Sequence, residues 1–91
     1  MIPRNRPPSL PGEILLEDFL RPLGISQTAL AAKMKVPLQR VNTVVSGKRA
    51  VTAETAILLS ESLGTSPEFW LNLQMTCDLF AALHRRRSRT G

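Results

Sequence analysis

Apolar residues recur at three- and four-residue steps in five successive segments of this 91-residue chain, with polar residues between them. This is the period of an amphipathic α-helix. Residues that favour helix ends, mainly Ser, Thr, Pro and Gly, separate the segments. The sequence therefore predicts an all-α fold of five helices, near residues 11–22, 26–35, 37–47, 52–64 and 67–84 or beyond.

Residues 26–49 (SQTALAAKMKVPLQRVNTVVSGKR) predict two short helices joined by a tight turn. The Ser26 hydroxyl can cap the first helix by accepting from its free backbone N–H groups. Pro37 has a fixed φ that suits the start of the second helix, and Gly47 suits its end. The apolar faces of the two helices consist of Leu30, Ala31 and Met34, and of Val41, Val44 and Val45.

The turn between these helices carries an unusual residue. The position that closes the first helix usually needs a positive φ, which Gly adopts freely. Lys35 occupies this position, and a non-Gly residue with such a φ costs on the order of 1 kcal/mol. We therefore expect strain at Lys35.

The second of these helices carries polar residues away from its valines. Gln39 can form two hydrogen bonds with adenine, and Arg40 can do the same with guanine. Asn42 and Thr43 follow Gln39 by three and four residues, on the same face. Two helices with this division of faces favour a helix-turn-helix that reads a DNA groove. The alternative is that each of these polar side chains only faces solvent and makes no contact with DNA.

The charge distribution supports a polyanionic partner. Residues 19–53 contain no Asp or Glu but six Lys and Arg, whereas all seven acidic residues lie outside this window. The net charge of +5 comes from the chain ends, because the body is close to neutral. A phosphate backbone is attracted to the first surface and repelled by the acidic flanks.

The last two segments carry most of the remaining apolar residues. In residues 52–64, Thr52 is a cap, and Ala53, Ala56, Ile57, Leu59 and Leu63 are expected to face the core. The longest segment is apolar around much of its circumference and so needs two burial surfaces. We assign one to the core and one to a second copy of the chain, through Phe69, Trp70, Leu73, Cys77 and Phe80. The alternative is that Phe69 and Trp70 only fill the core.

Composition excludes several classes of function. One Cys and one His cannot assemble a zinc finger, so no metal or cofactor is expected. An aromatic content of 4% without Tyr disfavours a base-stacking platform for single strands. No nucleophile has a base and an orienting partner at plausible positions, which argues against an enzyme. No signal peptide or membrane span is evident, so we expect a cytoplasmic protein.

The two ends of the chain differ in composition from the rest of the sequence. Residues 1–9 are rich in Pro and Arg and predict a flexible arm, disordered or in contact with DNA. Residues 10–84 form the domain. Residues 85–91 predict a basic disordered tail with general affinity for polyanions.

Three stretches together resemble the HigA-type antitoxins of the Xre/Cro-like helix-turn-helix regulators. They are PGEILLEDFLRPLGIS at residues 11–26, the motif at residues 26–49, and TSPEFWLNLQ at residues 65–74. The resemblance covers about residues 10–79. The chain departs from the family at Leu10, often His, and at Lys35, usually Gly.

The resemblance implies a five-helix, lambda-repressor-like domain that dimerises, binds operator DNA with an inverted repeat and represses its own operon. It also implies a HigB-like toxin, an mRNA-cleaving ribonuclease, as partner. A stand-alone Xre-family regulator without a toxin, or a pure protein-interaction module, remains the alternative. By the same resemblance, base contacts come from Leu38, Gln39, Arg40, Asn42 and Thr43, and phosphate contacts from Gln27, Ser46, Lys48 and Arg49.

Overall fold

This computed structural model describes the backbone of residues 8–90 and the side chains of residues 8–86. Within residues 8–90, the helices follow one another along the chain and no strand lies between them. Residues 1–7 of the predicted arm lie outside this range. The elements are α1 (Pro11–Ile14), the π-helix η1 (Leu15–Leu20), α2 (Arg21–Leu23), α3 (Gln27–Met34), α4 (Leu38–Val45), α5 (Ala53–Leu63) and α6 (Pro67–Thr90). Because α1, η1 and α2 form one unbroken rod, the predicted five-helix, all-α fold is confirmed.

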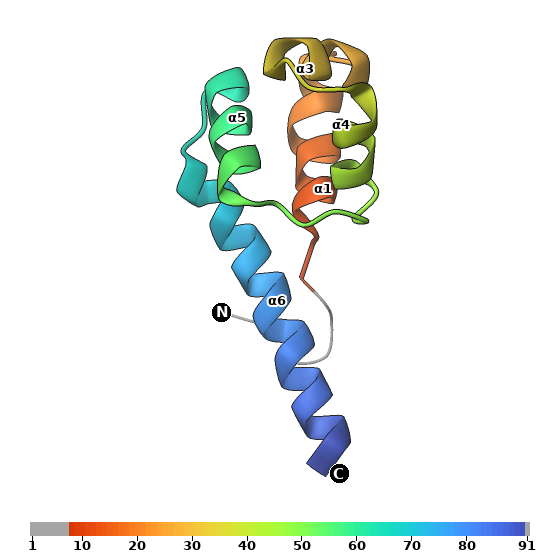
Figure 1. Ribbon diagram of the computed structural model, residues 1–91, viewed down its shortest axis with the longest axis vertical. Coiled ribbons are helices and arrows are strands. Elements are labelled where there is room, and N and C mark those ends of the chain that lie inside the picture. The colour runs from red at the N-terminus through yellow and green to blue at the C-terminus, as the bar shows by residue number, and fades with distance from the viewer. Residues whose placement is uncertain (1–7, 91) are drawn as a thin grey trace.

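The helices form a bundle from which α6 projects. The α1–η1–α2 rod, α3 and α4 lie together on one side, and α5 packs against the first half of α6 on the other (Figure 1). The second half of α6 extends beyond the bundle, so the molecule is 47 Å long but only 22 Å and 20 Å across.

The core lies between these two sides. It contains the predicted faces of α3 and α4. Its buried apolar residues, among those that the structure describes, are Leu15, Leu20, Leu30, Ala31, Met34, Val41, Val44, Val51, Ala56, Leu59 and Trp70. On α5, however, Ile57 is 47% exposed and Ala53 is also exposed, contrary to expectation. The buried positions of α5 are 55, 56, 59 and 60, and a period of 3.6 residues turns position 57 away from that stripe.

Side-chain caps begin three of the helices, including the two predicted at Ser26 and Thr52. The hydroxyl of Ser26 accepts from the Ala29 N–H at 3.0 Å, that of Thr52 from the Thr55 N–H at 3.3 Å, and that of Ser66 from the Phe69 N–H at 3.1 Å. Pro37 lies at the N-cap of α4, one residue before the helix begins. These caps satisfy N–H groups that the first helical turn leaves free.

The α1–η1–α2 rod ends one residue later than predicted. We expected Pro22 to stop it, but α2 includes Pro22 and ends at Leu23, before Gly24 with φ 68°. The π-helical turn accounts for this, because the Arg21 N–H bonds the Leu16 carbonyl five residues back. Pro22 directly follows this turn, whose wider i to i−5 pattern departs from the i to i−4 pattern that a proline ring obstructs.

At Gly12, the backbone of α1 packs directly against the backbone of the last turn of α4. A Cβ placed on Gly12 would lie 2.1 Å from the Val44 carbonyl oxygen and 2.6 Å from that of Val45. Both atoms belong to the backbone and cannot move aside as a side chain can. The Pro-Gly dipeptide therefore fixes the distance between α1 and α4.

The tail differs from the prediction. We expected disorder at residues 85–91, whereas the backbone of residues 85–90 continues α6. Arg is a good helix former, and its charge is favourable near a helix C-terminus. No Pro or Gly interrupts the segment before Gly91.

The turn between α3 and α4 contains the predicted left-handed residue. Lys35 has φ 57° and is the non-Gly residue with positive φ in the described chain. Its N–H bonds the Ala32 carbonyl at 3.2 Å, and the Val36 N–H bonds the Ala31 carbonyl at 3.1 Å. This pair of bonds is the Schellman motif, in which Gly is the usual residue.

Lys35→Gly should therefore stabilise the protein. It relieves about 1 kcal/mol of backbone strain, part of which is offset by the greater freedom of Gly in the unfolded chain. We expect Tm to rise by roughly 2–5 °C in a calorimetric scan. Lys35→Ala removes the same charge but keeps a Cβ, and should give no such rise. A lower Tm for Lys35→Gly would show that the lysine side chain stabilises the turn.

Candidate nucleic-acid interface

Helix α4 divides its residues between core and solvent. Val41 and Val44 are buried, whereas Leu38, Gln39 and Asn42 are exposed on the opposite face. The Leu38 side chain at the start of the helix is 42% exposed. The structure thus brings the amide groups of α4 to the surface, where they can reach a ligand.

Thr43 is less available than the sequence suggested. It is half-buried, and its hydroxyl donates to the Arg40 carbonyl at 3.1 Å. With Pro37, Gln39, Arg40 and Arg49, it lines an open hollow of about 310 Å³ on the surface of α4. The hollow brings the residues of α4 together with Arg49 of the following loop.

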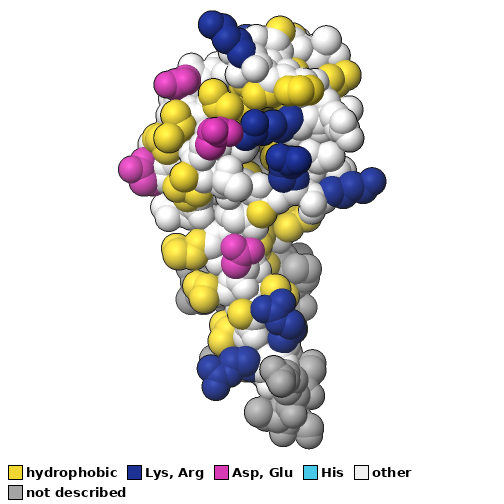
Figure 2. Space-filling view, in the orientation of Figure 1, with side chains coloured by type: hydrophobic (Ala, Val, Ile, Leu, Met, Phe, Trp, Pro, Cys, Tyr) yellow, Lys and Arg dark blue, Asp and Glu magenta, His cyan; other side chains and the backbone are white. Residues whose placement is uncertain are grey.

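Basic side chains surround α4. Lys48 and Arg49 are exposed on the loop between α4 and α5, and Ser46 ends α4 with its hydroxyl donating to the Thr43 carbonyl at 3.3 Å. Figure 2 shows Lys and Arg gathered on the α4 side of this face and acidic residues gathered on the α5 side. The acid-free window predicted from sequence is therefore also a region of the folded surface.

Gln27 lies at the first position of α3 and is half-buried. The first-turn N–H groups of a helix attract anions, because they lack partners and carry the positive end of the helix dipole. The described structure thus places an amide side chain and a helix N-terminus together at Gln27.

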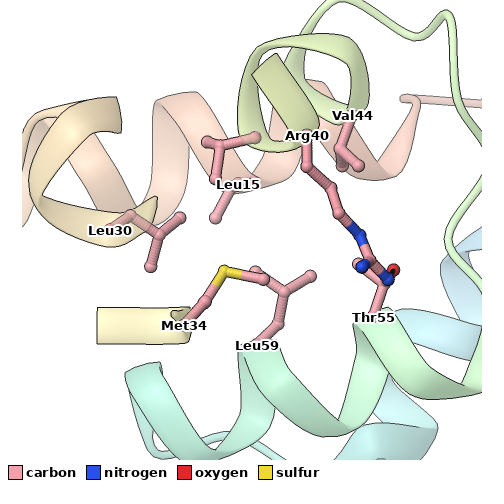
Figure 3. A pocket seen from close by; sticks show the side chains of 8 residues that line it. Leu15, Leu30, Met34, Arg40, Val44, Thr55 and Leu59 are labelled. Carbon is pink, nitrogen blue, oxygen red and sulfur yellow. Dashed lines mark hydrogen bonds between the residues drawn. The ribbon is translucent and has the colours of Figure 1, made fainter. Parts of the chain in front are cut away.

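Arg40 is not on the exposed face, and this corrects its assignment to direct base contact. Its side chain crosses from α4 to α5, as Figure 3 shows beside Thr55. One terminal nitrogen lies 2.6 Å from a Glu54 carboxylate oxygen and donates to the Thr55 hydroxyl at 3.3 Å. The side chain is only 24% exposed. The guanidinium therefore joins α4 to the start of α5.

The reason lies in the helical period and in a contact distant in sequence. Position 40 precedes Val44 by one helical turn, so it borders the buried side of α4. Glu54 and Thr55, in the next helix, then supply partners for its charge. The Arg40 Nε is buried without a hydrogen-bond partner among the described residues. The Glu54 side chain remains 72% exposed, so we expect the ion pair to contribute at most about 1 kcal/mol.

Trp70 is also corrected, because it belongs to the core and not to an interface. It is completely buried, and its indole N–H donates to the Thr65 hydroxyl at 2.7 Å. Its ring lies 5.2 Å from that of Phe19 and 5.0 Å from that of Phe69. Leu73 is half-buried against the same core. The first turns of α6 thus complete the bundle.

Helix α6 also keeps apolar residues at its surface, both in its first turn and further along the helix. Phe69 is 37% exposed, and Met75, Leu79 and Leu83 follow one another at four-residue steps with 54%, 46% and 49% exposure. Phe80 is half-buried and stacks on His84 with ring centroids 4.0 Å apart. The exposed stripe is therefore displaced from the residues that the sequence suggested.

Cys77 is half-buried, and its thiol lies 3.4 Å from the Ser9 carbonyl oxygen. Burial raises the pKa of the Cys77 thiol, and the carboxylates of Asp78 and Glu13 act in the same direction. The thiol is thus protonated at neutral pH and behaves as a small apolar group.

Sequence reasoning missed Gln74, the last residue of TSPEFWLNLQ. Its side-chain oxygen accepts from the Val51 N–H at 2.8 Å, and its nitrogen donates to an Asp78 carboxylate oxygen at 3.0 Å. This stretch carries part of the family resemblance, but nothing in its pattern indicates a contact with the loop after α4.

Within residues 8–90, no three acidic, His or Cys side chains are close enough together to hold a metal ion. In the same range, no helix has the length and hydrophobicity that crossing a bilayer requires.

The Arg40–Glu54 pair predicts a measurable coupling. In a double-mutant cycle of Arg40→Met and Glu54→Gln, we expect a coupling of about 0.5–1 kcal/mol in the free energy of unfolding. The coupling should shrink in 1 M salt because the carboxylate is exposed. Urea denaturation provides the measurement.

The control cycle combines Arg40→Met with Glu61→Gln, two turns further along α5. These two changes should be additive. Zero coupling between Arg40 and Glu54 would mean that the pair does not persist in solution, and that Arg40 is free to face outward.

Comparison with known proteins agrees with this architecture. A family model described as "Helix-turn-helix" matches residues 16–70. The chain is 43% identical over 82 residues to antitoxin HigA-1 of Vibrio cholerae, covering 90% of this chain and 76% of the relative. It is 40% identical over 86 residues to virulence-associated protein I of Dichelobacter nodosus, covering 93% and 80%.

A solved structure titled "Pseudomonas aeruginosa antitoxin HigA with higBA promoter" superposes with a TM-score of 0.85 at 38% identity. The match covers 91% of this chain and 90% of that one. The chain therefore belongs to the helix-turn-helix family and, within it, to the HigA-type antitoxins.

Proposed function

We propose that this protein is a sequence-specific repressor that binds double-stranded operator DNA, and that it is the antitoxin of a HigB/HigA-type module. The observation that carries the proposal is the position of α4. One face is fixed in the core, and the other presents Gln39 and Asn42 between basic residues. Amide side chains on such a helix form hydrogen bonds with base edges in a major groove.

The contacts divide by chemistry. Base contacts come from the exposed side of α4, namely Leu38, Gln39, Asn42 and Thr43. Arg40 instead holds α4 in position by its bonds to α5. Phosphate contacts come from Gln27 at the start of α3 and from Ser46, Lys48 and Arg49 after α4. Phosphate contacts contribute affinity and base contacts contribute specificity, so the two sets are experimentally separable.

A homodimer would place two copies of α4 about 34 Å apart, one turn of DNA, on an inverted repeat. Of the residues first assigned to its interface, Phe69, Cys77 and Phe80 remain candidates. The exposed stripe Met75, Leu79 and Leu83 joins them, because a projecting amphipathic helix gains by burying such a face.

The relatives support both parts of the proposal. The Pseudomonas aeruginosa structure is described as antitoxin HigA with the higBA promoter, and the Vibrio cholerae relative is called an antitoxin. We infer a HigB-like, mRNA-cleaving toxin as the partner. A repressor acts where the chromosome is, so this function implies a cytoplasmic protein. The alternative, a stand-alone regulator without a toxin, is favoured only by relatives that are not called antitoxins.

Protection of the promoter upstream of its own gene tests the DNA-binding function. Gln39→Ala should lose about 1–3 kcal/mol of discrimination at one base pair and leave the affinity for random DNA unchanged. Lys48→Ala should weaken operator and random DNA alike and lower the salt slope by about one. Titrations at several salt concentrations measure both. Equal losses for the two variants on both DNAs would contradict the assigned roles.

The toxin partner has a separate test. Glu54, Ile57 and Glu61 lie on one exposed face of α5, where an acidic surface surrounds an apolar side chain. Such a face suits a basic partner. Glu61→Lys should abolish co-purification with the protein encoded beside the gene and leave operator binding intact. Glu68→Lys, on α6, is the matched control. Co-purification that survives Glu61→Lys would exclude this face.

A further inference from the structure

The loop between α4 and α5 connects the candidate DNA surface to α6 through one side chain. Val51, near the end of this loop, is 5% exposed, and its N–H donates to the Gln74 side-chain oxygen at 2.8 Å. Gln74 lies on the second turn of α6 and is itself half-buried. The side-chain nitrogen of Gln74 donates to Asp78 at 3.0 Å, and this bond orients the amide.

The two ends of the loop are held differently. At its start, the N–H groups of Lys48 and Arg49 both bond the Thr43 carbonyl, at 2.9 Å and 3.0 Å. These bonds join the start of the loop to α4, so this part of the loop moves with α4. At its end, the bond from Val51 to Gln74 fixes the loop to a different helix. The backbone of Lys48 and Arg49 thus forms the anchor on α4, and Ala50 separates Arg49 from the anchor on α6.

The surroundings leave room for the loop to move if the second anchor is lost. A hollow of about 80 Å³ is lined by Gly12, Val44, Gly47, Arg49, Ala50 and Gln74, among others. Packing restrains the loop closely at Gly47, where an added Cβ would lie 2.9 Å from the Leu10 side chain. Gly47, Arg49, Ala50 and Gln74 all line this hollow, so the loop borders it on both sides of Lys48.

We propose that Gln74 is a positioning residue for DNA binding. It holds the α4–α5 loop so that Lys48 and Arg49 meet the phosphate backbone, and it connects α6 to the DNA-binding surface. The inference rests on the proposed function and deepens it. It concerns the geometry of phosphate contact, so its loss should change affinity without changing sequence preference. A fixed cation also gives up less conformational freedom on binding than a mobile one.

Gln74→Met tests the proposal, since Met has a similar length but no acceptor for the Val51 N–H. We expect binding to operator and to random duplex to weaken alike, by roughly threefold to tenfold. This is the effect expected when one hydrogen bond that orders the loop is lost. The salt dependence should become shallower, and combination with Lys48→Ala should give less than the sum of the two losses. Titrations are made well below the Tm of each variant.

The matched control swaps donor and acceptor at constant net charge. In the double variant Gln74→Glu with Asp78→Asn, a carboxylate still accepts from Val51 and an amide supplies the neighbouring donor. This variant should bind DNA within about twofold of the wild type. Gln74→Asn keeps the amide but shortens the side chain by one methylene, so it should resemble Gln74→Met. It serves as the second variant if Gln74→Met does not fold.

A purely structural role would lower the Tm of Gln74→Met or Gln74→Asn and leave affinity and salt slope at wild-type values. That result would overturn the inference while the proposed function stands. Failure of the wild-type protein to bind any duplex would overturn both. A loss confined to the operator would assign Gln74 to specificity and would also contradict its role in phosphate contact.

Discussion

The position of α4 depends on a backbone contact that leaves no space for a side chain. Gly12 brings α1 against the carbonyl groups of Val44 and Val45, so the last turn of α4 rests directly on another helix. Arg40 joins the first turn of α4 to α5. A helix that reads bases must be held within a fraction of an ångström, and backbone contact provides this better than flexible side chains can. The exposed amides of α4 are thus held in place by contacts of α4 with α1 and α5.

In the proposed function, the same arrangement places the groups that give specificity and those that give affinity on different segments. The amide groups occupy the exposed face of α4, whereas Lys48 and Arg49 belong to the loop after it. The loop is held by α4 at one end and by α6 at the other. Helix α6 has two parts. Its first turns pack Trp70 into the core, and its later turns project from the bundle and carry an exposed apolar stripe. A molecule bound to that stripe would act on the helix that anchors the α4–α5 loop.

Much of the fold was predictable because it depends on local chemistry. The caps at Ser26, Thr52 and Ser66 and the left-handed Lys35 follow from free N–H groups and from the geometry of a helix end. The apolar faces of α3 and α4 follow from the helical period. The helical backbone of residues 85–90 was missed because charge runs were taken to be disordered, although arginine itself favours a helix.

By itself, the sequence determined the number and type of the helices, the acid-free basic window and the outward position of Gln39 and Asn42. Only the tertiary structure decided the roles of Arg40, Trp70 and Gln74. A helical period places Arg40 at the border between core and solvent, and its direction depends on Glu54 and Thr55, 14 and 15 residues away. Likewise, the Gln74 amide meets a backbone N–H 23 residues earlier in the chain. Such contacts arise from how helices pack against one another, which local periodicity does not encode.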